Sequence, residues 1–189
     1  MKRIWMILLL PLLVFSDNVN GWTSLHEAIY ANDTKNIDMH INKRQNIEKP
    51  SRAGIAPLHL AVKMRQMSTV EKLLSKGVDI DIQDNNGLTP LHYAIGQKQT
   101  KLAKFLITKE ADMNIPNKYG MTSLHQAAFR GDTDMIQFMI DNGVTVDIKN
   151  KQGATPCQLA YAKKNIGATS LLQHYSKLPC GMKTLPKKE

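Results

Sequence analysis

Short apolar stretches recur along the chain in pairs that are separated by polar turns. Residues 58–64 and 69–76 form one such pair, with apolar side chains three and four positions apart in each stretch. This spacing is that of one face of an α-helix, so each stretch predicts a short helix. Gly77 follows the second stretch, as a glycine often does at the end of a helix. The pattern predicts two antiparallel helices, followed by an extended hairpin loop over residues 78–86.

The pattern repeats with a period of 33 residues, and a glycine marks the start of each unit. These glycines are Gly21, Gly54, Gly87, Gly120 and Gly153. The third unit begins with Gly-Leu-Thr-Pro-Leu-His over residues 87–92. Its glycine permits backbone angles that other residues avoid. The threonine suits the helix N-cap, and the proline suits the first helical position.

A period of 33 residues with a Thr-Pro-Leu-His core resembles the ankyrin repeat. The resemblance covers Gly21 to about Tyr175. It implies an all-α repeat solenoid, an ankyrin stack of five helix-turn-helix repeats with hairpin loops. Arg44 and Glu110 depart from the pattern, because they replace the glycine expected after the second helix. Residues 45–53 lack the hairpin pattern, so we expect the first loop to be irregular.

The N-terminus has the order of charged, apolar and small residues that is typical of a secretory signal peptide. Lys2 and Arg3 precede an apolar run over residues 4–15, and Ser16 follows that run. A membrane-spanning helix needs about 20 apolar residues, so the run is too short for a permanent membrane anchor. We expect cleavage after Ser16 and a periplasmic or secreted protein.

These signals divide the chain into three parts. We expect a signal peptide over residues 1–16, an ankyrin repeat domain over residues 17–176 and a C-terminal tail over residues 177–189.

The charge balance indicates an acidic partner. The formal net charge is +9, and removing Lys2 and Arg3 leaves 23 basic against 16 acidic residues, a net charge of +7. The basic residues are scattered, and no nucleic-acid-binding motif accompanies them, so we expect no nucleic-acid partner.

Four histidines occur in register, and at first sight they suggest a metal ladder. They are His26, His59, His92 and His125. Zinc ligands lie about 2 Å from one ion, and residues one repeat apart in an ankyrin stack are too distant to share it. The family resemblance implies that each imidazole ties its Thr-Pro turn to neighbouring backbone.

Other candidate chemistry is incomplete. Cys157 and His174 could form a nucleophile and base, but no orienting third group or oxyanion site accompanies them. Asp79, Asp81 and Asp84 lack the glycine and the bidentate acid of a calcium-binding EF-hand loop. We therefore expect no enzyme activity, no metal and no cofactor.

The two cysteines predict a disulfide between Cys157 and Cys180. An antiparallel second helix that ends near Tyr175 returns the chain to the end of the helix that holds Cys157. The alternative is two free thiols.

Ankyrin proteins bind partners on their concave side, so the resemblance implies a binding surface at loop tips and first helices. Residues after the motif glycines are mostly large and apolar here, and aromatic and basic residues accompany them, as in interaction hot spots. The candidate partner-binding residues are Trp22, Tyr30, Arg52, Ile55, Lys63, Met64, Leu88, Lys118, Tyr119, Met121, Phe129 and Arg130. The alternative is that some of these side chains pack against the next loop.

The resulting hypothesis is an exported protein-binding module that is monomeric when free. Its partner would be an exported enzyme with an acidic surface. We expect an inhibitor or self-protection factor, directed at a periplasmic enzyme such as a peptidoglycan-cleaving peptidase. Two alternatives stay open, a scaffold that stabilises an exported enzyme and a secreted effector that binds host proteins.

Overall fold

The computed structural model describes residues 20–44 and 46–181 of the chain. The predicted signal peptide over residues 1–16 and the end of the tail, residues 182–189, lie outside the described residues. In the described part, no helix is long and apolar enough to cross a membrane.

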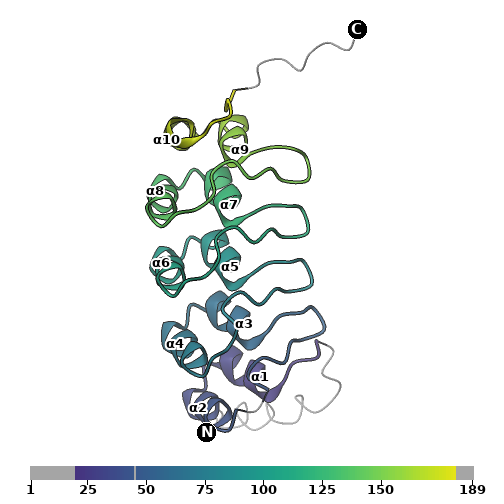
Figure 1. Cartoon of the computed structure of the whole chain (residues 1–189). Coiled ribbons are helices and arrows are strands. Elements are labelled where there is room, and N and C mark those ends of the chain that lie inside the picture. The colour runs from purple at the N-terminus through teal and green to yellow at the C-terminus, as the bar shows by residue number, and fades with distance from the viewer. Residues whose placement is uncertain (1–19, 45, 182–189) are drawn as a thin grey trace, which may run out of the picture.

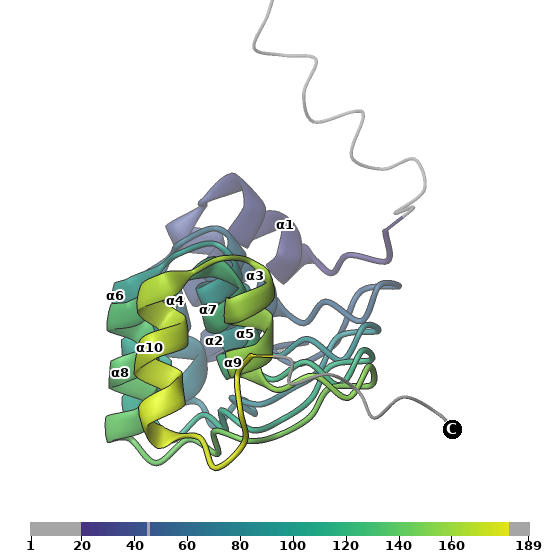
Figure 2. The same ribbon diagram turned by 90° about the horizontal axis from the view of Figure 1, so that it is seen from above.

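The described chain folds into a stack of consecutive helix pairs (Figure 1). The helices are α1 (Ser24–Ala31), α2 (Thr34–Asn42), α3 (Pro57–Lys63), α4 (Met67–Ser75), α5 (Pro90–Gly96), α6 (Thr100–Thr108), α7 (Ser123–Arg130), α8 (Thr133–Asp141), α9 (Pro156–Ala162) and α10 (Ile166–Tyr175). The odd-numbered helices form one layer and the even-numbered helices the other. Hairpin loops project to one side, next to the odd-numbered layer, and Figure 2 shows them superposed along the stack axis. The predicted all-α repeat solenoid is confirmed.

The first helix of each pair begins as the motif predicts. Thr23, Thr89, Thr122 and Thr155 are N-caps whose hydroxyls accept a hydrogen bond from the third helical amide. Pro57, Pro90 and Pro156 occupy the first helical position of α3, α5 and α9. A proline lacks the amide proton that this position leaves unpaired, so it fits here without loss.

The motif histidines connect each repeat to the next. The Nδ1 atom of His92 accepts a hydrogen bond from the Thr89 amide at 3.2 Å, and its Nε2 atom lies 3.1 Å from the Met121 carbonyl. Because Nδ1 accepts from an amide, the proton sits on Nε2, which donates to the carbonyl. The equivalent Nε2 contacts measure 2.8, 2.9 and 3.1 Å for His26, His59 and His125.

Apolar side chains from both helix layers form one core that continues along the stack. The motif leucines Leu25, Leu58, Leu91 and Leu124 are buried, and Cys157 takes the same place in the last pair. Outer helices contribute Ile37, Val70, Ala103 and Ile136, which are buried and one period apart, and α10 contributes the buried Ala168. Each helix pair therefore covers the apolar face of the one before it, as stacking requires.

The loop tips approach one another closely enough to require glycine. The amide of Asn85 donates to the Ala53 carbonyl at 3.1 Å, and the same bond recurs from Lys118 to Asn86 and from Lys151 to Tyr119. A Cβ atom on Gly54 would lie 2.4 Å from the Asn85 nitrogen.

Arg44 and Glu110 keep the backbone conformation of the glycine that they replace. Their φ angles are 52° and 67°, against 80° and 82° for Gly77 and Gly143 in the same place. The left-handed geometry after the second helix is thus set by the fold rather than by glycine.

The first loop is more regular than its sequence predicts. The Ser51 amide donates to the Ile55 carbonyl at 2.9 Å, as the Asp84 amide does to Leu88 at 3.0 Å in the second loop. The first loop differs from the regular hairpin only before its tip. There, Asn46 has a φ of 54° and its carbonyl accepts a hydrogen bond from the Lys49 amide. The expectation of an irregular loop therefore holds only for its first part, because stacking on the second loop fixes the tip.

Candidate protein-binding surface

Several large side chains lie exposed on the inner helices and the loop tips. Tyr30 is 61% exposed, Phe129 45% and Met64 37%. Basic residues accompany them. The exposed members of the predicted set are Tyr30, Arg52, Lys63, Met64, Lys118, Tyr119, Phe129 and Arg130, which we call the aromatic-basic face.

The residues that follow the motif glycines have a different role. Trp22, Ile55, Leu88 and Met121 are only half-exposed, and Trp22 and Ile55 pack against the core. The carbonyl groups of Ile55, Leu88 and Met121 accept the histidine hydrogen bonds, which turns this backbone inward. These four side chains are therefore less accessible to a partner than the residues of the aromatic-basic face.

At the N-terminal end, the structure brings three of the predicted residues together. The rings of Trp22 and Tyr30 lie 5.3 Å apart at a tilt of 59°. The Arg52 side chain crosses the adjacent glycine, because a Cβ on Gly21 would lie 2.8 Å from its Cγ atom. Tilted contacts between aromatic rings are favourable. This end therefore combines a pair of aromatic rings with a cation beside them.

At the C-terminal end, sequence reasoning missed one residue. The Lys163 ammonium lies 4.3 Å from the ring centre of Phe129, in a cation–π contact. Lys163 occupies the place of Arg130 and Met64 in the 33-residue register, so this periodicity could have identified it. Tyr119, at the preceding loop tip, is 63% exposed.

The middle of the face is small and neutral. Gly96 stands where neighbouring repeats carry Lys63 and Phe129, and Gln97 stands where they carry Met64 and Arg130. The exposed aromatic residues are therefore divided between the two ends of the stack.

The inner helices carry few charged residues, with Lys63 and Arg130 as the basic ones. Within α1, α3, α5, α7 and α9, Glu27 is the single carboxylate. The buried Asp84 carboxylate is occupied internally, since it accepts from the Tyr93 hydroxyl at 2.9 Å and from two amides. This contact and burial both raise the pKa of Tyr93, with burial the larger cause.

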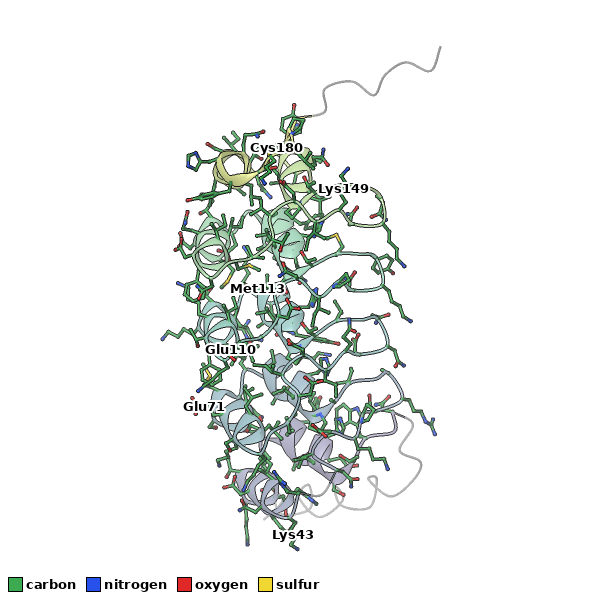
Figure 3. The ribbon with its side chains drawn as sticks, in the orientation of Figure 1. Lys43, Glu71, Glu110, Met113, Lys149 and Cys180 are labelled. Carbon is green, nitrogen blue, oxygen red and sulfur yellow. A yellow bond between two sulfur atoms is a disulfide. The ribbon has the colours of Figure 1, made fainter. Side chains whose placement is uncertain are left out.

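The cysteine pair is bonded as predicted. Cys157 and Cys180 form a disulfide with their Cα atoms 5.0 Å apart, at the C-terminal end of the stack (Figure 3). Cys157 is therefore not available as a thiol nucleophile. His174 is exposed and its ring contacts Tyr175 at 4.9 Å. Among the described residues, no three His, Cys, Asp or Glu side chains gather where they could hold a metal ion.

Comparison with known proteins agrees with the architecture. The family model for ankyrin repeats, three copies, matches residues 25–117 and again residues 97–179. A search of curated proteins found no match. Because the two matched segments together span most of the sequence, the chain belongs to the ankyrin repeat family.

Proposed function

We propose that this protein is an exported binding module that restrains a periplasmic enzyme. Ankyrin repeats form a scaffold for protein-protein interaction. The signal-peptide pattern of residues 1–16 supports export. The module would bind as a monomer and would act as an inhibitor or self-protection factor.

The observation that carries this proposal is the aromatic-basic face. Tyrosine and arginine are enriched among the residues that dominate binding energy, and here Tyr30, Tyr119, Arg52 and Arg130 remain exposed. Arg52, Lys63, Lys118 and Arg130 surround them with positive charge. Complementary charge favours a partner with an acidic surface.

A rigid stack of this kind suits steric inhibition. Its face is fixed by the histidine bonds and loop-tip bonds between repeats, so little conformational entropy is lost on binding. A module held over an active site would exclude substrate without any catalytic group of its own. Peptidoglycan-cleaving peptidases are exported enzymes that a cell needs to restrain, and they are the target that we propose.

The test combines capture with an activity measurement. The mature chain is used to capture partners from periplasm, and the captured enzyme is then assayed for peptidoglycan cleavage with and without the chain. We expect dose-dependent inhibition, and a variant with Tyr30→Ala and Phe129→Ala should fail to inhibit. A matched control, Lys43→Ala with Lys149→Ala, changes exposed residues outside the aromatic-basic face.

Other outcomes would point elsewhere. A bound enzyme that retains its activity and becomes more stable would indicate a scaffold. Binding only to host proteins would indicate a secreted effector. Either result would contradict inhibition while leaving the aromatic-basic face as the binding surface.

A further inference from the structure

The outer side of α9 and α10 is the C-terminal end of the helix stack, and no further helix pair of the described chain covers it (Figure 1). A hollow of about 720 Å³ lies on this side. We call the residues that line the hollow the end face, and they are Tyr161, Ala162, Lys164, Ile166, Thr169, Ser170 and Gln173.

Part of the end face has the polar character that the last unit of a repeat protein needs for solubility. Thr169 stands where the preceding outer helix carries Ile136, and Gln173 stands where it carries Ile140. These two polar residues replace side chains that would otherwise pack against a following repeat. The sequence thus closes the stack here.

Two large apolar side chains on the end face depart from this rule. Ile166 is 83% exposed, although α2, α6 and α8 each begin with a threonine at the same place of the repeat. Tyr161 is 54% exposed, whereas the equivalent residue of the preceding repeat, Ala128, is small and buried. The repeat pattern explains neither side chain, and both line one hollow. Neighbouring exposed apolar residues of this kind mark an interaction surface.

Positive charge surrounds the end face. The sequence has no aspartate or glutamate between Ile148 and Lys188, and its basic residues in this segment are all lysines. Lys164 lines the hollow itself, and Lys163 and Lys177 are exposed just after α9 and α10. An occupant of the end face therefore has to bring negative charge.

This charge disfavours two occupants that the chain itself could supply. A second copy docked end to end would bring the same lysines without a carboxylate, so the two surfaces would repel each other. Residues 182–188 of the tail add Lys183, Lys187 and Lys188 to the same charge. The occupant is therefore either an acidic protein or an anionic lipid surface.

The residue types favour the lipid surface. Protein interfaces are enriched in arginine and depleted of lysine, and the aromatic-basic face accordingly contains Arg52 and Arg130. The end face has only lysine, which can bury its apolar stem while the ammonium group stays among lipid headgroups. Tyrosine suits the boundary between water and lipid because one end of its side chain is apolar and the other polar.

We propose that the end face docks on a membrane surface that contains anionic phospholipid. Ile166 and the ring of Tyr161 enter the boundary between headgroups and acyl chains, and Lys164 pairs with lipid phosphate. The attachment is peripheral, because no described helix is long and apolar enough to cross a membrane. None of these three residues belongs to the aromatic-basic face, so this inference goes beyond the proposed function and does not depend on it.

The test measures how the mature chain, residues 17–189, floats with lipid vesicles in a density gradient. This chain keeps every described residue and lacks the apolar run of residues 4–15, which could itself bind lipid. We expect binding to vesicles made of equal parts of phosphatidylglycerol and phosphatidylcholine, and no binding to phosphatidylcholine alone. Binding should weaken as the salt concentration rises, because salt screens the lysines.

The decisive variant combines Ile166→Thr with Tyr161→Ala. It should bind the anionic vesicles about tenfold more weakly, because the two inserted side chains are lost. Both replacements copy the preceding repeat, which has Thr133 and Ala128 at these places, so the variant is expected to fold. Circular dichroism and the melting temperature check that it does.

Two control variants change the opposite end of the stack. Tyr30→Ala with Met39→Ala also removes two exposed large side chains, from α1 and α2, and should bind like the native chain. Lys164→Gln should weaken binding about fivefold through the loss of one cation near the lipid. Lys43→Gln makes the same change of charge far from Cys180 and the end face, and should have little effect (Figure 3).

Several outcomes would overturn the proposal. These are no binding to the anionic vesicles, equal binding to the neutral ones, and equal weakening in the end-face variants and their controls. Polyglutamate bound as tightly as the anionic vesicles would instead indicate an acidic protein. A dimer of the native chain that the decisive variant dissociates would indicate a second copy.

Discussion

The side-chain amide of Gln158 donates to the carbonyl of Pro179 at 3.3 Å. Gln158 occupies the place of the motif histidines, each of which reaches the next repeat through its Nε2 atom. The tail therefore replaces the loop of a following repeat. Asp147 also binds the tail in the way that a loop binds the following repeat. Its carboxylate accepts a hydrogen bond from the Lys177 amide at 2.9 Å. Asp81 accepts the corresponding bond from the Asp112 amide of the following repeat at 3.0 Å.

The first prediction concerns this tail. Replacing Cys180 by Ser should lower the free energy of unfolding by about 3 kcal/mol, because the disulfide no longer restricts the unfolded chain. Urea unfolding of the oxidised native chain and of the variant measures the difference. Asp147→Asn is a milder comparison, since it weakens the bond to Lys177 and leaves the disulfide in place. If the native chain labels at two thiols when alkylated without reduction, the bond is absent from the protein in solution.

The second prediction is loss of stability in acid. Burial lowers the pKa of His26, His59, His92 and His125 below the ordinary value of 6.5, against an opposing effect of the carbonyl contacts. The unfolded chain then binds more protons than the folded one, so stability is full above about pH 6.5 and falls below it. His92→Gln copies the arrangement at Gln158 and should reduce this pH dependence. Unfolding midpoints that stay constant between pH 7 and pH 5 would contradict the assignment of neutral buried imidazoles.

The third prediction compares two left-handed positions. Gly54→Ala should destabilise the stack by more than about 1 kcal/mol, because a φ of 76° and the nearby Asn85 backbone both oppose a Cβ atom. Glu110→Gly should instead stabilise it by roughly 0.5 to 1 kcal/mol, by relieving a side chain at a φ of 67°. Thermal melting measures the change in stability of each variant. Melting temperatures that shift in the same direction would show that local backbone strain does not control stability at these sites.

The fourth prediction separates binding residues from packing residues. Tyr30→Ala and Phe129→Ala should leave the melting temperature nearly unchanged, and each should weaken partner binding by about 2 kcal/mol. Charged replacements of Leu88 and Met121 should reduce both binding and stability, because these side chains are half-buried and the Met121 sulfur contacts Asn150 at 3.4 Å. Calorimetry on the same samples distinguishes the two effects, and a large melting shift for Tyr30→Ala would place that residue among the packing ones.

The repeat architecture could be predicted because its determinants are local and periodic. A threonine N-cap, a proline at the first helical position and a glycine in a left-handed turn act within a few residues, so they can be identified in the linear sequence. The pairing of Cys157 with Cys180 was also accessible, since a helix of known length returns the chain to a known end. These features follow from element length and register alone.

Only the tertiary structure decided which apolar residues near the loops are exposed. Trp22 and Ile55 pack against the core, whereas Tyr30 and Phe129 remain at the surface, although all four are large and apolar in sequence. For Ile55 the difference arises because the histidine of the preceding repeat bonds its carbonyl and turns this backbone inward, and that contact joins residues 29 positions apart. Local sequence thus determined each unit, and the stacking of one unit on the next determined what the units present to a partner.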